Sequence, residues 1–278
     1  MSIDTIVDER ALREIYLSAF EHIVKTEQPA TVMCSYNRLA GTYLSDNKRM
    51  LTDVLRDEWG FEGIVVSDWG AVNDRVAGIK AGMDLEMPGN RGANDKNIVK
   101  AVKDGTLTEE ELDKVVLRLI KFALERKANE DKNVKPDFHA HDALAAKIAA
   151  NGAVLLKNEG SALPLSSAQK VAVIGALAKT PRYQGSGSSL INPTKVTSFL
   201  DAMDAEGQKY DYAPGYKMRG DGYSARLIKE AVEKAKGKDA VLVFVGLTPE
   251  YESEGFDRKH LNMPDSHYML IEEIAKVN

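Results

Sequence analysis

Cysteine, excess positive charge and long apolar runs are scarce or missing in this sequence. Its 278 residues hold one cysteine, Cys34, which excludes an internal disulfide and leaves no cysteine pair for a zinc site. The formal net charge of -5 gives no electrostatic reason to expect a nucleic acid or an anionic membrane as a partner. No apolar stretch approaches the roughly 18 to 20 residues that span a bilayer. We therefore expect no nucleic-acid partner and no membrane partner.

Signals for metals and cofactors are equally sparse. The five histidines show no metal-ligand spacing on a helix, so no metal is expected. The flexible segment QGSGSS at residues 184–189 could cradle a phosphate, but it lacks the third glycine of the dinucleotide fingerprint and the Gly-Lys-Ser/Thr of a P-loop. We expect no cofactor and interpret this segment as a substrate-facing or interdomain loop. A nucleotide-binding protein is an alternative that rests on this loop alone.

The two ends of the sequence carry a further expectation. Met1 is followed directly by SIDTIVDER, without the basic and apolar leader of a signal peptide, and this favours a cytoplasmic location. The helical pattern at residues 266–277 stops at Asn278 without a cap or tail. Both ends look cut from something longer, so we expect a fragment whose native location depends on what precedes Met1.

The first half of the chain alternates strand-like and helix-like segments. Apolar runs predict strands at residues 31–36, 63–67 and 83–87, and Cys34 in the first is expected to be a buried, inert thiol. Apolar residues at helical spacing predict helices at residues 10–25, 45–59, 73–81, 95–102 and 108–126. Ser45 or Asp46 is expected to cap the second helix, and a capping box at Thr108 opens the last. This alternation predicts a parallel sheet with right-handed crossovers.

A polar segment that contains a proline, ANEDKNVKPD at residues 128–137, reads as a linker. Beyond it, helices at residues 142–151, 198–206 and 224–236 and buried strands at 170–175 and 240–246 predict a second α/β region. We therefore expect domains at residues 1–127 and 141–278, joined by a linker at 128–140. The first domain has too few units to close an eight-stranded barrel, so a barrel would be represented by its last part only.

The segment GIVVSDWG at residues 63–70 is the strongest local signal for chemistry. A buried parallel strand reads as a continuous apolar run, and ligands of α/β folds bind just past the carboxyl ends of such strands. Asp68 has that position and lies beside Trp69. Sugar-cleaving chemistry requires a carboxylate near an oxocarbenium-like transition state. From this segment alone, a turn or helix-capping aspartate after a core strand is an equal alternative.

An acidic loop, EYESEGFDR at residues 250–258, follows the last predicted strand and again lies where open sheets bind ligands. Its three glutamates, with an Asp-Arg pair and an aromatic residue, could supply a general acid and hydrogen bonds to sugar hydroxyls. A solvated acidic loop is the alternative. Asp68 and this loop belong to different predicted domains, so each could supply one carboxylate of a pair that faces across an interdomain cleft. A retaining glycosidase needs such a pair about 5 to 5.5 Å apart.

Several motifs occur in a fixed order along the chain. They are CSYNRLAG at 34–41, GFEGIVVSDWGA at 60–71, GMDLEMPG at 82–89, VLLKN at 154–158, LPL at 163–165, QGSGSS at 184–189 and EGFDR at 254–258. In this combination the chain resembles glycoside hydrolase family 3 over essentially its whole length. The resemblance implies an α/β fold made of the C-terminal part of a (β/α)₈ TIM-type barrel and an incomplete α/β sandwich domain, with the active site between them.

The resemblance also implies a role for each matched residue. Asp68 matches the catalytic nucleophile, and Glu254 matches the acid/base, with Glu252 as the alternative. Tyr36 would lie next to the nucleophile, and Trp69 would stack on the sugar in the first subsite. The residues assigned to substrate binding are Tyr36, Trp69, Met33, Glu252, Asp257 and Arg258. The chemistry requires an ionised Asp68 and an acid whose pKa is raised, so that it is protonated when the leaving oxygen departs.

The function implied by the resemblance is that of a retaining, exo-acting β-glucosidase, which hydrolyses terminal β-D-glucosyl residues of small or oligosaccharide glucosides through a covalent glycosyl-enzyme. A β-xylosidase of the same family is the nearest alternative. The family's early barrel strands, which hold the sugar hydroxyls, are absent from this sequence. A catalytically incomplete fragment that binds sugar weakly is therefore a second alternative. Unpaired sheet edges would favour pairing with another chain, so a homo-oligomer is considered as well.

Overall fold

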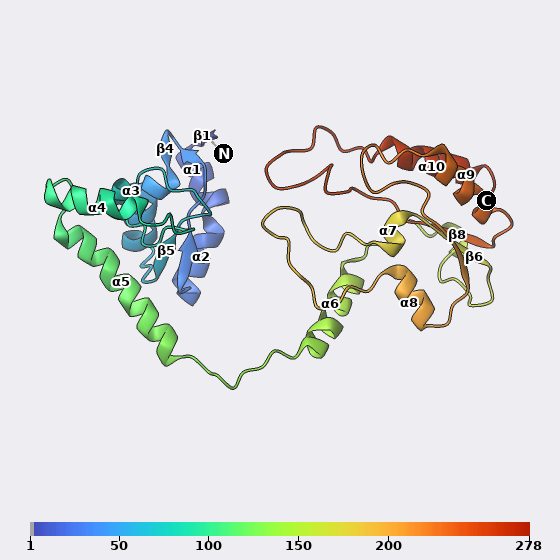
Figure 1. Ribbon diagram of the computed structural model, residues 1–278, viewed down its shortest axis with the longest axis horizontal. Helices are drawn as coiled ribbons and strands as arrows, with labels where there is room; N and C mark the ends of the chain where they lie inside the picture. Colours follow the sequence, from blue (N-terminus) through green and yellow to red (C-terminus); the bar gives the residue numbers. More distant parts are fainter. Residues whose placement is uncertain (1–2) are drawn as a thin grey trace. The chain divides into compact units, whose positions relative to one another are not determined.

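The computed structural model describes residues 3–278 of the chain and contains two compact units. The first ends at Lys135, and the second is Pro136–Asn278 (Figure 1). In both units, parallel strands alternate with helices, so the architecture is mixed α/β. Among the described residues, no helix is both long enough and apolar enough to cross a membrane.

The elements of the first unit are short strands between helices. In chain order they are β1 (Asp4–Thr5), α1 (Glu9–Ala11), η1 (Leu12–Tyr16), α2 (Ser18–Glu27), β2 (Thr31–Met33), β3 (Arg38–Leu39), β4 (Thr42–Tyr43), η2 (Leu44–Asp46), η3 (Arg49–Glu58), β5 (Ile64–Val66), α3 (Arg75–Ala81), α4 (Ala93–Lys103) and α5 (Glu109–Ala128).

Strands β2 and β5 form the predicted parallel pair, with Val32 opposite Val65. The prediction of a third strand at residues 83–87 is wrong. This segment has no strand, and a single parallel bridge joins Val66 to Leu85. The ladder stops there because the next donor of this segment, the Met87 N–H, bonds to the Ser67 hydroxyl (2.8 Å) and not to a strand carbonyl. A side chain therefore replaces the backbone partner that a third strand would require.

The helical stripe expected at residues 10–25 is mostly exposed. The segment is helical in three pieces, but only Leu12 and Val24 within it are buried. At its centre the Leu17 N–H bonds to the Leu12 carbonyl (2.9 Å), five residues back. This wider π-type turn shifts the phase of the following helix, so an unbroken 3.6-residue period selects the wrong face. The predicted stripe residues on the exposed side are Ile15, Tyr16, Phe20 and Ile23.

Helix η3 supplies much of the first unit's core. Met50, Leu51, Val54 and Leu55 are buried as expected and pack with Val65 of β5. The expected cap is wrong, because Ser45 and Asp46 belong to the short helix η2. The neighbouring Asn47 caps instead, and its Oδ1 accepts the Met50 N–H (3.1 Å).

A buried ion cluster, which the sequence did not reveal, joins three elements of this unit. The fully buried Asp84 carboxylate accepts from Arg56 (2.7 Å) and Arg118 (2.6 Å), and it also accepts the Val65 N–H (2.7 Å). Arg75 donates to the Asp84 carbonyl (2.8 Å). Burial lowers the pKa of Arg56 in spite of the neighbouring carboxylate. The cluster ties η3 and α5 to the strand that leads to Asp68.

The linker is shorter than expected. The Thr108 capping box is confirmed, and α5 continues to Ala128. Helix α6 (Phe138–Gly152) begins inside the linker predicted at 128–140, because the Asp137 carboxylate accepts the Ala140 N–H (2.9 Å) and caps it. Residues 129–137 are therefore the segment without helix, and all of them are exposed.

The second unit has three longer parallel strands. After α6 its elements are η4 (Glu159–Ser161), β6 (Val171–Ile174), α7 (Ala176–Lys179), α8 (Phe199–Ala205), β7 (Tyr210–Ala213), α9 (Ala225–Ala235), β8 (Ala240–Val243) and α10 (Asp265–Ala275). The strand order is β7-β6-β8. The buried strand expected at β6 is confirmed. The strand expected at β8 is present but half-buried, and β7 was not expected.

Helices cover both faces of this sheet. Successive side chains of a strand point to opposite faces, so Ala172 and Ile174 of β6 pack with α9 and α10, while Val171 and Val173 pack with α7 and α8. All four residues are buried, as expected for a central parallel strand covered on both faces. The carboxyl ends of the three strands lead into loops, and the acidic loop follows β8.

The buried His267 of α10 should make the second unit sensitive to acid. Its Nδ1 accepts the Gly246 N–H (3.4 Å), its ring lies 4.1 Å from that of Tyr216, and burial lowers its pKa below 6.5. The folded state thus favours the neutral ring. The stability that this provides is complete above about pH 6.5 and is lost as pH falls through the lowered folded-state pKa, by at most about 1.4 kcal/mol per pH unit.

This expectation is checked by amide hydrogen exchange of β6 residues between pH 4 and 8. His267→Asn keeps an acceptor for Gly246 but cannot titrate, and it should flatten the decrease in unfolding free energy below pH 6.5. His139→Asn, at an exposed histidine of α6, should leave the decrease in place. Equal pH dependence in His267→Asn and the unmodified chain would contradict the assignment.

Candidate functional site

Asp68 lies two residues past the end of β5, as expected, and is half-buried. Its Oδ1 accepts the N–H of Trp69 (2.6 Å), and its carbonyl accepts the N–H of Ala71 (3.0 Å). The carboxylate is therefore bonded within its own turn, and it forms no ion pair with any residue of the described range 3–278. Such a carboxylate can face a ligand without first losing a cation partner.

The end of β5 is braced by the chain that follows α3. The Ser67 N–H donates to the Leu85 carbonyl (2.8 Å), and the Ser67 hydroxyl accepts the Met87 N–H (2.8 Å). The Gly70 N–H donates to the Met87 carbonyl (2.8 Å). Bonds on both sides of Asp68 thus hold its backbone in place, although no strand pairs there.

The structure brings three of the expected site residues close to Asp68. The Tyr36 hydroxyl donates to the Trp69 carbonyl (2.7 Å), which joins the segment after β2 to the turn that carries Asp68. Met33 and Asp68 line one cavity of about 440 Å³, together with Phe20 and Ile23. The Trp69 side chain is 64% exposed and Met33 is 62% exposed, so both offer apolar surface to a ligand. A carboxylate beside such surface suits a sugar, whose C–H faces are apolar.

Cys34 lines the same cavity but is not a reactive group. It is buried one residue past β2, and burial raises the pKa of its thiol to about 11. A thiol with this pKa is protonated at neutral pH, and the thiolate is the reactive form. Its position agrees with the inert thiol expected from the sequence.

In the second unit, Glu254 occupies a tight turn closed by a bridge between Ser253 and Phe256. Gly255 has a φ of +96°, a conformation that glycine adopts without strain, which explains why the turn forms at EG. The Glu254 Oε2 accepts the Ser188 N–H (2.5 Å), and the Glu254 N–H donates to the Ser186 carbonyl (3.2 Å). The QGSGSS segment, expected to face substrate or lie between domains, therefore contacts the acidic loop.

The electrostatics of Glu254 differ from the expectation for a general acid. The Ser188 hydroxyl and N–H bond to its carboxylate and lower the pKa of Glu254 below 4.5, because both donors favour the charged form. The side chain is exposed, so no burial compensates. In this arrangement the ionised form of the Glu254 carboxyl is favoured, and the raised pKa expected for the acid is not found.

Glu252 is held in a different way. Arg182 donates to the Glu252 carbonyl (3.1 Å) and forms an ion pair with its carboxylate (3.4 Å). Arg182 also reaches the Leu247 carbonyl (3.4 Å), so it joins the start of the segment after β8 to the acidic loop. Glu252 has a cation partner and a structural role, whereas the Ser188 N–H and hydroxyl that bond to the Glu254 carboxylate are neutral donors.

The remaining two expected residues line a cavity of the second unit, which is smaller than the cavity beside Asp68 in the first unit. Asp257 and Arg258 line about 220 Å³ together with Tyr251, Phe256 and His260. Glu250 also borders this cavity, and its Oε2 accepts the Gly220 N–H (2.6 Å). The acidic loop thus combines charged and aromatic side chains around one hollow.

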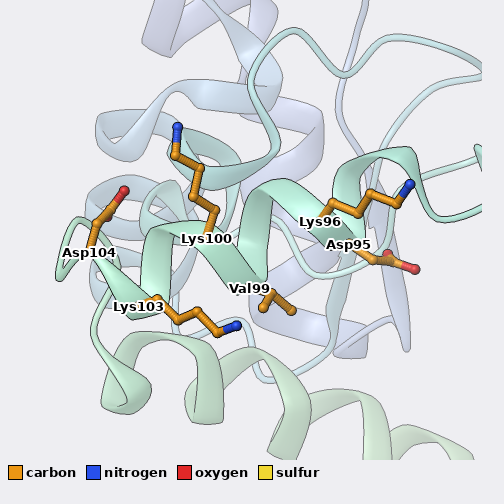
Figure 2. Close-up of a pocket in the computed structure, with 6 residues that line it drawn as sticks. All are labelled: Asp95, Lys96, Val99, Lys100, Lys103 and Asp104. Carbon is orange, nitrogen blue, oxygen red and sulfur yellow. The ribbon is translucent and has the colours of Figure 1, made fainter.

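A wider groove of about 580 Å³ lies elsewhere, on helix α4, and none of the candidate site residues lines it (Figure 2). It is lined by Asp95, Lys96, Val99, Lys100, Lys103 and Asp104. Lysines and aspartates of one exposed helix face surround it, which is a typical solvated surface. Over residues 3–278, no group of three His, Cys, Asp or Glu side chains is arranged to hold a metal ion.

Comparison with known proteins assigns both units to one family. The model of the glycosyl hydrolase family 3 N terminal domain matches residues 3–122. The model of the glycosyl hydrolase family 3 C-terminal domain matches residues 153–278. Together they account for most of each compact unit, in the order in which the motifs predicted them.

Several relatives match this chain over its full length, and two of them are described here. "Thermostable beta-glucosidase B" of Acetivibrio thermocellus is 50% identical over 280 residues, which are 37% of its length. "Exo-alpha-(1->6)-L-arabinopyranosidase" of Bifidobacterium breve is 49% identical over 288 residues, which are 38% of its length. The chain thus spans less than two-fifths of either relative.

Solved structures of β-glucosidases share the fold of this chain. The GH3 β-glucosidase of Bifidobacterium adolescentis is 48% identical with a TM-score of 0.91, over 99% of this chain and 40% of that one. β-Glucosidase 3B of Thermotoga neapolitana, in complex with glycerol, is 35% identical with a TM-score of 0.83, over 99% and 42% of the two chains. Both domain models match, the relatives align with the whole of this chain, and the solved structures share its fold. The chain therefore belongs to glycosyl hydrolase family 3.

Proposed function

We propose that this chain provides the two catalytic carboxylates of a retaining, exo-acting β-glucosidase, with Asp68 as nucleophile and Glu254 as acid/base. The observation that carries the proposal is the position of Asp68, past the end of β5 and on a cavity bordered by Met33, with Tyr36 and Trp69 bonded to each other beside it. The names of the β-glucosidase relatives support it. Within this proposal, the first unit is the last part of a (β/α)₈ barrel and the second is part of an α/β sandwich.

In the first step of the proposed reaction, an Asp68 oxygen attacks the anomeric carbon while Glu254 gives its proton to the departing glycosidic oxygen. The bond from the anomeric carbon to the leaving group breaks, and a covalent glycosyl-aspartate forms. In the second step, Glu254 removes a proton from water, which attacks the same carbon and releases Asp68. For this, the two carboxyl groups must come within about 5 to 5.5 Å of each other.

Glu254 is preferred to Glu252 as the acid/base because of their partners. Arg182 donates to the carbonyl of Glu252 and pairs with its carboxylate, so Glu252 holds the loop in place. Glu254 bonds to an N–H that can serve a neutral or an ionised carboxyl. An acid/base alternates between these two states.

A second candidate is an α-L-arabinopyranosidase. It is favoured by one observation: a relative of that name is 49% identical over 288 residues, almost as similar as the β-glucosidase. The β-xylosidase alternative has no such relative among those described above. Because few contacts separate one pyranose from another, Asp68 and Glu254 would serve all three substrates in the same way.

The test is a graft in which this chain replaces the 280 aligned residues of the Acetivibrio thermocellus β-glucosidase; we call the product the grafted enzyme. Hydrolysis of nitrophenyl β-D-glucoside, β-D-xyloside and α-L-arabinopyranoside is compared. We expect the highest kcat/KM for the glucoside, with retained configuration in the first-formed product. Preference for the arabinoside would support the second candidate, and an inverted product would overturn the retaining mechanism.

A variant pair decides which glutamate is the acid/base. In the grafted enzyme, Glu254→Ala should lose about 10²- to 10⁴-fold in kcat for substrates with poor leaving groups, because proton donation contributes about that factor. Dinitrophenyl glucoside, which leaves without a proton, should lose much less, and azide should restore turnover by intercepting the glycosyl-enzyme. Glu252→Ala should show neither pattern, and the opposite result would assign the role to Glu252.

A further inference from the structure

A three-residue turn, Ser186–Gly187–Ser188, contacts both the backbone and the side chain of Glu254. The Ser186 carbonyl accepts the Glu254 N–H (3.2 Å), and the Ser188 N–H donates to the Glu254 Oε2 (2.5 Å). The turn comes from a loop 66 positions earlier in the chain. Two bonds from one turn to one residue fix the orientation of Glu254 as well as its position.

Gly187 allows this approach, and any other residue would prevent it. A Cβ at position 187 would lie 2.5 Å from the Glu254 Cβ and 2.5 Å from its Oε2, closer than real Cβ atoms come to a neighbour. The φ of Gly187 is +96°, which a side chain would also disfavour. Gly185 is different: a Cβ there would meet only the Ser189 side chain within 4 Å, and its φ lies outside the left-handed region. The two glycines are therefore a matched pair for substitution.

The bond from the Ser188 N–H to Oε2 gives the two carboxyl oxygens of Glu254 different roles. When Glu254 is ionised, Oε2 accepts the Ser188 N–H, and the Ser188 hydroxyl, the second donor to this carboxylate, can rotate away so that Oε1 takes a proton. When Glu254 is protonated on Oε1, Oε2 is the carbonyl-like oxygen and accepts the same N–H. One contact thus serves both states, and the proton is always carried by the other oxygen.

We propose that the Ser186–Ser188 turn is a positioning element that anchors Oε2 of Glu254 and reserves Oε1 for proton transfer. This inference rests on the proposed function of Glu254 as acid/base. Arg182, through Glu252, holds the same acidic loop from its other side, so the carboxylate of Glu254 is directed by the turn and the base of its loop by Arg182. The bonds from Ser188 also favour the ionised carboxyl, which suits the step that removes a proton from water.

The test uses the 278-residue chain and measures the Ser188 amide and the Glu254 carboxyl carbon by NMR between pH 3 and 8. We expect both signals to titrate together, with a midpoint below 4.5. In Glu254→Gln the Ser188 amide should stop titrating, while in Glu252→Gln it should titrate unchanged. A Ser188 amide that keeps titrating in Glu254→Gln, or never titrates, would overturn the proposal.

The glycine pair tests the positioning role itself. Gly187→Ala should separate the turn from Glu254, shift the carboxyl midpoint upward toward 4.5 and uncouple the Ser188 amide, whereas Gly185→Ala should change neither signal. Equal behaviour of the two variants would reject a specific role of Gly187. These signals require no turnover, so they stand apart from the proposed function: absence of hydrolysis by the grafted enzyme would reject the glucosidase and leave the contact measurable.

Discussion

Asp68→Gly in the grafted enzyme should lower kcat for nitrophenyl glucoside by about 10⁴-fold or more. The proposed reaction forms a covalent bond to this carboxylate, and removal of a covalent nucleophile costs an enzyme factors of this size. The effect should be in kcat, because the apolar surface of Trp69 and Met33 would still contact the sugar. Stability should change little, since the Asp68 carboxylate bonds to its neighbour's N–H within one turn.

Azide separates a lost nucleophile from a damaged site. In Asp68→Gly, azide can attack the anomeric carbon directly and should yield a glycosyl azide of inverted configuration. In Glu254→Ala, azide attacks the glycosyl-aspartate and should yield the retained product. Asp113→Asn, at an exposed carboxylate of α5, is the control and should keep full activity. An Asp68→Gly enzyme with ordinary turnover, or with a retained azide product, would remove Asp68 from its assigned role.

Asp84→Ala should destabilise the first unit by about 3 to 5 kcal/mol. The substitution leaves two arginines, Arg56 and Arg118, without the carboxylate that compensates their buried charge, and breaking one partner of a buried pair has costs of this order. The Val65 N–H also loses its acceptor. Because Val65 belongs to β5, the strand that leads to Asp68 should be weakened directly.

The two tryptophans make this measurement specific. Trp59 and Trp69 are the only tryptophans in the sequence, and both belong to the first unit, so their fluorescence during urea unfolding reports that unit alone. Glu62→Ala, which removes an exposed pair with Lys121 (3.6 Å), is the control and should cost less than about 1 kcal/mol. Similar losses in the two variants would mean that the buried cluster contributes no more than a surface pair.

Features of the sequence that depend on neighbouring residues were predictable. A continuous apolar run identified β5 and the position of Asp68 at its end, and the capping box at Thr108 identified the start of α5. The buried strand β6 was equally clear, because a central parallel strand is apolar on both faces. Strand β7 was missed because its sequence, YDYA, contains no continuous apolar run, and four residues are too few for an alternating pattern to stand out.

Features that depend on distant residues were not predictable. Asp84 is joined to arginines 28 and 34 positions away, and nothing in its own segment indicates that it is buried. The same holds for Glu254, whose partner Ser188 is 66 positions away. The raised pKa expected for Glu254 followed from the chemistry of an acid, whereas the observed direction follows from donors that a local pattern cannot reveal.

The exposed segment at residues 129–137 has a practical consequence for every measurement on this chain. It holds Lys132, which lies outside any helix and is followed by Asn133, whereas Lys135 is followed by Pro136, and trypsin does not cleave a Lys-Pro bond. Extended, solvent-exposed backbone is what proteases require, so brief trypsin treatment offers a way to divide the polypeptide at this point. The two halves could then be purified, and the free energy of unfolding of each unit could be measured separately.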